Sequence, residues 1–210
     1  MSIEKPLRAD AQRNRKRVLE VAHAVFASEG IAVPIDEIAR RAGFGVGTLY
    51  RHFPTKEALF GAVIIDHVER VLETARALAT SSDPGHALLG CLIRIVEEGG
   101  VKRHLFDALA GAEFPEKARY EELKHELERT IEVLLVRAQK ARAVRRDVDI
   151  DDVLALLTGA FAAVDRRAGD RLTNARLLAL VFDGLRTSAV TTAPPPARAV
   201  RMGNRVRSAT

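Results

Sequence analysis

The sequence is poor in the residues that build disulfide-rich, cysteine-ligated or aromatic-rich proteins. Its 210 residues include no tryptophan and one cysteine, Cys91, and aromatic residues make up only 5%. A single cysteine excludes an internal disulfide and a cysteine-rich metal site, and it suits a reducing compartment. With few aromatic residues, alanine, leucine and valine must fill most of the core, a mixture that favours helix over sheet. We therefore expect an all-α protein.

Long apolar runs and catalytic signatures are also missing. No stretch approaches ~18 consecutive apolar residues, and the start, MSIEKPLRAD, has no apolar signal region. The chain contains no GxxxxGK[ST], HExxH or GxSxG motif and no paired-carboxylate constellation. We expect a cytoplasmic protein that neither enters nor crosses a membrane, catalyses no reaction and carries no cofactor.

The basic residues gather at the two ends of a chain whose net charge is +5. Residues 1–60 hold ten Lys/Arg against seven Asp/Glu, residues 61–190 hold nineteen against twenty-one, and residues 191–210 hold four Arg and no acid. Such a balance at the start is typical of an arm near a polyanion, although a solvated, disordered start explains it equally well. The first seventeen residues carry the strongest excess, in Lys5, Arg8, Arg13, Arg15, Lys16 and Arg17 against Glu4 and Asp10.

Apolar periodicity and breaker residues predict about nine helices followed by a flexible basic tail. Thr55, Asp149 and Thr173 are the expected N-caps, and a proline run from Thr191 with no apolar period predicts the tail over 191–210. The predicted helices cover residues 9–29, 35–42, 46–52, 57–79, 86–98, 101–109, 115–143, 150–167 and 173–188.

Two of these short helices form the pattern of a DNA-reading helix-turn-helix. A turn containing Gly43 joins helix 35–42 to helix 46–52, and the second helix of such a unit can enter a DNA major groove. Leu49 and Phe53, four residues apart, should face inward against the first helices. The outward residues include small ones, Gly45, Val46, Gly47 and Thr48, which allow close approach to bases, and polar ones, Tyr50, Arg51, His52 and Lys56, which can reach phosphates.

The run FASEGIAVPIDEIARRAGFGVGTLYRHFPTKEALF strongly resembles the DNA-binding region of the tetracycline-repressor (TetR) family of bacterial transcriptional regulators. The match covers about residues 13–63. The resemblance implies a homodimer on an inverted-repeat operator, a helical effector domain, and repression relieved by a small molecule. It also implies base-proximal positions at Gly45, Val46, Gly47 and Thr48, and phosphate contacts from Tyr50, His52 and Lys56. Arg51 either reads a guanine or is a surface charge.

One departure from the family pattern concerns the start of the second helix. Family members often have threonine or serine where this chain has Pro34 and Ile35, and that hydroxyl caps the helix and touches a phosphate. Asp36 or a backbone amide is left to replace the contact.

The C-terminal half carries two sets of apolar candidates. The helices 150–167 and 173–188 have wide apolar stripes that would pair with a second copy as a four-helix bundle, namely through Val153, Leu156, Leu157, Ala160, Leu178, Val181, Phe182 and Leu185. Residues that could face a ligand cavity, or equally build the core, are Phe60, Val63, Leu88, Cys91, Leu92, Phe106, Leu109, Phe114, Leu127, Phe161 and Val164.

Histidines give no metal site by spacing. His104 and Asp107 share a helix face, but two ligands do not make a site. His67, His86 and His125 have no partner at ligand spacing. We therefore expect no metal.

The sequence as a whole predicts three parts: a DNA-binding domain over 1–56, a ligand-binding and dimerisation domain over 57–190, and the tail over 191–210. We expect a dimeric bacterial regulator that works at the nucleoid, binds double-stranded DNA, and is released from its operator by an unknown small-molecule effector. The alternative is an architectural or co-regulatory DNA-binding protein without a ligand. The sequence does not allow us to infer the operator sequence, the regulated genes, the effector, the sign of regulation or any DNA contact of the tail.

Overall fold

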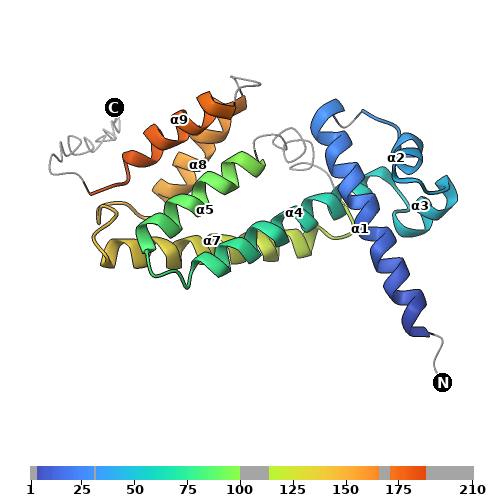
Figure 1. Ribbon diagram of the computed structural model, residues 1–210, viewed down its shortest axis with the longest axis horizontal. Coiled ribbons are helices and arrows are strands. Elements are labelled where there is room, and N and C mark those ends of the chain that lie inside the picture. Colours follow the sequence, from blue (N-terminus) through green and yellow to red (C-terminus); the bar gives the residue numbers. More distant parts are fainter. Residues whose placement is uncertain (1–3, 31, 100–113, 166–170, 188–210) are drawn as a thin grey trace, which may run out of the picture.

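The computed structural model describes residues 4–30, 32–99, 114–165 and 171–187, and within these ranges it contains helices and no strand (Figure 1). The all-α prediction is therefore confirmed. The predicted helix 101–109 and the tail 191–210 lie outside the described residues. The helices are α1 (Glu4–Glu29), α2 (Ile35–Ala42), α3 (Val46–His52), α4 (Lys56–Leu78), α5 (Pro84–Gly99), α7 (Lys117–Lys140), α8 (Ile150–Asp165) and α9 (Arg171–Asp183).

The N-terminal helices pack around one hydrophobic core. On α1 the buried positions Val18, Ala22, Val25 and Phe26 follow three- and four-residue steps and face α2 and α4. The helix ends at Gly30, which has a left-handed φ of 77° and donates its N–H to the Phe26 carbonyl. This first core continues through α2 and α3 into α4.

Helix α4 runs from the N-terminal helices to the side where α5 and α7 lie (Figure 1), and its buried side chains belong to two hydrophobic cores. Thr55 caps its start, because its hydroxyl oxygen accepts the Ala58 N–H at 3.1 Å, as the sequence predicts. Residues from Leu59 onward fill the first core, whereas Val71 and Ala75 belong to the second. The first core therefore extends beyond residue 57, into the part of the chain that the sequence assigns to the effector domain.

The second core lies among α5, α7, α8 and α9. Helix α7 packs against both α4 and α5, and α8 and α9 pair on the other side of α5 (Figure 1). None of the described helices is both long and apolar enough to cross a membrane.

Several helix ends differ from the predicted ones. Asp149 caps α8 as expected, accepting the Asp152 N–H at 3.0 Å. The prediction for Thr173 is wrong, because α9 begins at Arg171 and Thr173 lies inside it. Helix α5 starts at Pro84 rather than residue 86, since Asp83 accepts the His86 N–H and proline fits a first turn. Helix α7 ends at Lys140, shortly before Arg142 takes a left-handed φ of 58°.

Candidate nucleic-acid interface

Helices α2 and α3 are joined by a tight turn that glycine makes possible. Gly43 has a left-handed backbone (φ 76°, ψ 29°), and its N–H bonds to carbonyls in the last turn of α2. Gly45 is the N-cap of α3. Buried Ile38 and Leu49 hold the two helices together from inside, at 0% exposure each. Phe53, just after α3, is buried in the same core, so the inward positions are those that the sequence predicts.

The opposite side of α3 faces outward. Gly45, Gly47, Arg51 and His52 are exposed, Val46 and Tyr50 are 38% and 43% exposed, and Thr48 and Lys56 are half-buried. A side chain at Gly47 would meet nothing within 4 Å. Packing inside the subunit therefore gives no reason for glycine there, although glycine weakens a helix. The surface combines accessible backbone, one hydroxyl, one phenol and three potential cations.

An ion-pair network attaches α2 to the end of α1. Glu37 accepts hydrogen bonds from Arg40 and Arg41, and Arg41 also pairs with Glu29 of α1. The two arginine hydrogen bonds lower the pKa of Glu37 from 4.5 to about 2. These arginines therefore position α2 within the domain, at the surface of the helix-turn-helix.

Arg15 of α1 joins the recognition unit, which comprises α2, α3 and Phe53 (residues 35–53), to the C-terminal half. Its guanidinium carbon lies 5.0 Å from the centre of the Phe53 ring, just after α3. The same guanidinium lies 3.9 Å from a carboxylate oxygen of Glu116, directly before α7. Sequence patterns do not reveal this residue's role, because its partner is about a hundred residues away.

The start of α2 has no side-chain cap. Pro34 is the N-cap residue and forms no side-chain hydrogen bond, while its carbonyl accepts the Glu37 N–H at 3.2 Å. Ile35 is 7% exposed and packs in the first core. At this position the chain has an apolar contact instead of the hydroxyl that the resemblance implies.

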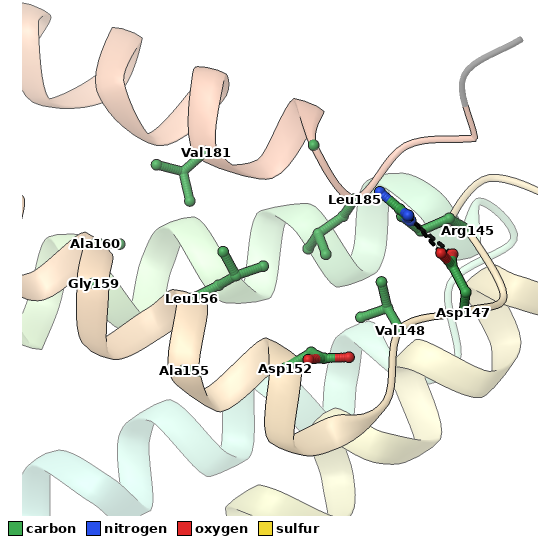
Figure 2. Close-up of a pocket in the computed structure, with 11 residues that line it drawn as sticks. Arg145, Asp147, Val148, Asp152, Ala155, Leu156, Gly159, Ala160, Val181 and Leu185 are labelled. Atoms are coloured by element: carbon green, nitrogen blue, oxygen red, sulfur yellow. Dashed lines mark hydrogen bonds and ion pairs between the residues drawn. The ribbon is translucent and has the colours of Figure 1, made fainter. Parts of the chain in front are cut away.

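A groove of about 600 Å³ lies between α8 and α9 (Figure 2). The Arg145–Asp147 ion pair closes one end, with the guanidinium Nε 2.7 Å from Asp147 Oδ1. Leu156 and Val181 face each other across the groove (Figure 2). The wall also contains small residues and residues of the α7–α8 loop, so that the complete lining is Arg145, Asp147, Val148, Asp152, Ala155, Leu156, Gly159, Ala160, Val181, Gly184 and Leu185.

Comparisons with known proteins identify both halves. Residues 18–63 match the family model for bacterial regulatory proteins of the TetR family, and residues 83–187 match the model for the SbtR-like C-terminal domain of transcriptional regulators. A TetR regulatory protein of Mycobacterium vanbaalenii is 43% identical, with a TM-score of 0.69, over 87% of this chain and all of its own. The chain belongs to the TetR family. It is a DNA-binding transcriptional regulator and not an enzyme.

Other TetR relatives agree with this assignment. A TetR regulator of Streptomyces coelicolor is 33% identical over 83% of this chain and 99% of its own, with a TM-score of 0.68. An HTH-type transcriptional regulator of Staphylococcus aureus is 46% identical over 59 residues, so the match spans about a third of that relative, 32% of its length. Residues 4–17 precede both ranges that the family models match.

The predicted ligand-facing residues of this TetR protein fall into two separate cores. Phe60, Val63 and Phe114 are buried in the first core, and Leu88, Cys91 and Leu92 are buried in the second. Leu127 is half-buried and packs against both, and Phe161 packs against the second. None of these residues lines the groove between α8 and α9. Phe106, Leu109 and the side chain of Val164 lie outside the described part of the chain.

The predicted dimer-contact residues divide by burial. Leu156 and Val181 are half-buried and line the groove. The other six are already buried within the subunit, each at 5% exposure or less: Val153, Leu157, Ala160, Leu178, Phe182 and Leu185. The apolar stripes of α8 and α9 thus fill the second core first, and only their margins reach the surface.

Sequence reasoning missed the small residues of the groove. Ala155 and Gly159 lie four residues apart on α8, and Gly184 follows α9. Their spacing is visible in the sequence, but small residues also occur on solvent-facing sides of helices. Leu180, which precedes the groove residue Val181 on α9, is a large apolar side chain that is 63% exposed.

Metal ligands do not gather in the described part of the TetR chain. No group of three or more His, Cys, Asp or Glu side chains there is placed to hold an ion. His104 and Asp107 lie outside the described residues. Cys91 is 2% exposed, and burial raises the pKa of its thiol to about 12.

Proposed function

We propose that this TetR regulator is a homodimeric repressor that reads an inverted-repeat operator and leaves it when a small molecule binds. The observation that carries the proposal is the outward side of α3. It exposes glycine backbone at Gly45 and Gly47 beside Thr48, on a helix held rigidly from inside. A repressor of this kind works where the chromosome is, at the bacterial nucleoid.

The recognition surface suits a major groove. The absence of a Cβ at Gly45 and Gly47 lets the helix approach base edges closely, and Thr48 offers a hydroxyl and a methyl group for a base. Tyr50 and His52 lie at the second half of α3, where they can reach phosphates, and Arg51 can bind a guanine. Lys56, in the first turn of α4, adds a cation to a helix N-terminus that already favours an anion.

The groove between α8 and α9 supports a second copy as the partner. Its wall of Leu156 and Val181 is apolar, and Ala155, Gly159 and Gly184 leave room for a helix of the second subunit to approach closely. Leu180 is 63% exposed on α9. Pairing of α8 and α9 with their symmetry mates would cover this surface as a four-helix bundle.

Release by an effector would act through α4. This helix begins directly after the recognition unit and contributes side chains to both cores. A ligand that favours another packing of the second core would shift α4 and change the spacing of the two recognition helices. Operator binding requires that spacing to match successive major grooves, about 34 Å apart.

The experiment that tests the function is selection of bound DNA from a random pool at ~150 mM salt. We expect enrichment of an inverted repeat, and loss of at least tenfold in affinity for that repeat in Thr48→Ala. A matched control is Thr74→Ala, which changes the same residue type on α4. Salt-sensitive binding without any enriched sequence would instead support the architectural protein that the sequence left open.

The dimer is tested by sedimentation of an exposed-residue variant. Leu180→Glu introduces a charge at the proposed interface without disturbing the core, so we expect monomers at concentrations where the parent protein is dimeric. Val133→Glu is the control, because Val133 is a similarly exposed apolar residue, at 52%, on α7. A dimer that survives Leu180→Glu, or dissociates with Val133→Glu alone, would place the interface elsewhere.

A further inference from the structure

The first half of α1 is a helix that extends beyond the first core. Helix α1 begins at Glu4, and the first buried residue that the structure describes along it is Val18. The fourteen residues before Val18 span about 21 Å at 1.5 Å per residue. Figure 1 shows this end of α1 projecting from the rest of the molecule. The feature needs an explanation, because helices in proteins derive most of their stability from packing an apolar face.

The composition of this segment indicates a polyanionic partner. Residues 4–17 contain six Lys/Arg and two Asp/Glu. Arg13, Lys16 and Arg17 lie within one helical turn of one another, and all three are exposed. A row of phosphates complements such an excess of positive charge, whereas an apolar partner does not.

The base of the segment lies against the recognition unit. A Cβ at Gly43, in the turn before α3, would be 3.7 Å from the Arg17 guanidinium. Arg15 covers Phe53, directly after α3, at 5.0 Å. Basic residues of α1 therefore lie at both ends of α3. When α3 occupies a major groove, this part of α1 is held next to the DNA backbone.

The direction in which this segment points indicates which part of the operator DNA it would contact. In Figure 1 the free end of α1 points away from the side on which α8 and α9 lie. If the second subunit covers α8 and α9, this end points away from the centre of the operator. The DNA beyond the outer end of each half-site is thus within its reach.

We propose that residues 4–17 form a basic arm that lies along the phosphate backbone outside each half-site. The proposal rests on the proposed function, because it places α3 in the half-site. The arm reads no bases and binds through phosphate charge, releasing counterions from the duplex. Its length of about 21 Å corresponds to about six base pairs at 3.4 Å each.

The salt dependence of binding tests the arm. In the variant Lys5→Gln/Arg8→Gln/Lys16→Gln the proposed dimer loses three charges in each subunit. We therefore expect the slope of log K against log salt to fall by about 5, so that the affinity difference from the parent shrinks by about a thousandfold between 50 and 200 mM salt. The control variant Lys124→Gln/Arg129→Gln/Lys140→Gln removes the same charge from exposed positions on α7. An equal slope in the arm variant and the parent, or an equal drop in the control, would overturn the proposal.

Trimming the operator gives a second, independent measurement. Removing six base pairs outside each half-site should weaken binding of the parent protein at least tenfold and leave the arm variant almost unaffected. Equal losses for both proteins would overturn the proposal. If the parent protein selects no operator, the proposed function fails, and the slope comparison on a random duplex still decides whether the arm binds phosphates.

Discussion

Gly47 is unfavourable for the stability of α3 and, in the proposed complex, favourable for its approach to DNA. It lies in the first turn of α3, and a Cβ there would meet no atom within 4 Å. We expect Gly47→Ala to stabilise the protein by up to about 0.5–1 kcal/mol, because alanine restricts the unfolded chain and favours helix. The same methyl group would hold α3 away from the base edges, so operator affinity should fall at least tenfold. Urea denaturation and a binding titration measure the two effects.

Gly90→Ala is the matched control for this substitution. Gly90 lies within α5, and a Cβ there also meets nothing within 4 Å. This variant should gain stability without losing operator affinity. A Gly47→Ala protein that binds DNA as tightly as the parent would show that α3 does not approach the bases closely.

Glu37 gives the recognition unit a pH dependence. Arg40 and Arg41 lower its pKa from 4.5 to about 2, so the carboxylate stabilises the fold fully above pH 4.5 and loses this effect as the pH falls toward 2. Glu37→Gln should therefore have a lower Tm than the parent at neutral pH, and the difference should vanish near pH 2. Thermal melts between pH 2 and 7 measure it, with Glu132→Gln on the exposed side of α7 as control. A difference that persists at pH 2 would assign the effect to packing.

At the level of single residues, the sequence predicts local partners and misses distant ones. Thr55 and Asp149 are recognisable as caps because their partners lie three residues away. Arg15 is not, because Phe53 and Glu116 reach it only through the tertiary fold. The inward positions Leu49 and Phe53 followed from helical spacing, whereas the candidate DNA contacts were named from the types of the outward residues and from the resemblance to the TetR family.

Among the helices, α4 has a specific contact with the segment that leads into α7. Phe114 is 7% exposed and packs in the first core, and a Cβ at Gly61 would overlap its ring. Gly61→Ala should therefore destabilise the protein by about 1–3 kcal/mol, because the ring must move within a packed core. Urea denaturation measures the loss.

A double-mutant cycle separates the loss of stability caused by the Phe114 ring from any other destabilisation by a side chain at position 61. Phe114→Leu leaves more room at the site, so Gly61→Ala should cost clearly less in its presence than in the parent chain. Additive effects of the two substitutions would mean that the helix backbone, and not the ring, limits the residue at position 61.

The presence of each helix was easier to predict than the residues at which it ends or the contacts that its apolar side makes. Periodicity found every described helix, but α1 begins at Glu4 and not residue 9 because its first turns contain no apolar face to detect. The stripes of α8 and α9 were readable as apolar. How much of each stripe the subunit itself buries depends on α5, which packs against both helices, and on α7, which packs against α8.

The whole molecule should unfold as one unit. Helix α4 contributes to both cores, and Leu127 of α7 packs against both. Loss of either core therefore removes packing from the other, so we expect a single calorimetric transition whose midpoint rises with protein concentration if the dimer is intact. Two resolved transitions would show that the recognition unit folds independently of the bundle.

At the same scale, the sequence could predict the all-α architecture and name a candidate DNA-reading side, but it could not locate a ligand site. Its eleven cavity candidates are ordinary apolar residues, and those that the structure describes are distributed over two cores. Nothing in such a residue's identity distinguishes a wall of a cavity from a filled interior.

Because Cys91 is buried, a label can be attached to a second, introduced cysteine alone, and distances between such labels can be measured. It is the single thiol of the chain, it is 2% exposed, and burial raises its pKa to about 12, so it should react with labelling reagents only after unfolding. A cysteine introduced at exposed Ser28 of α1, near the recognition unit, would then be the sole reactive sulfur of each subunit. In the proposed dimer, a pair of spin labels attached there would report the separation of the two recognition units directly, with and without a candidate effector.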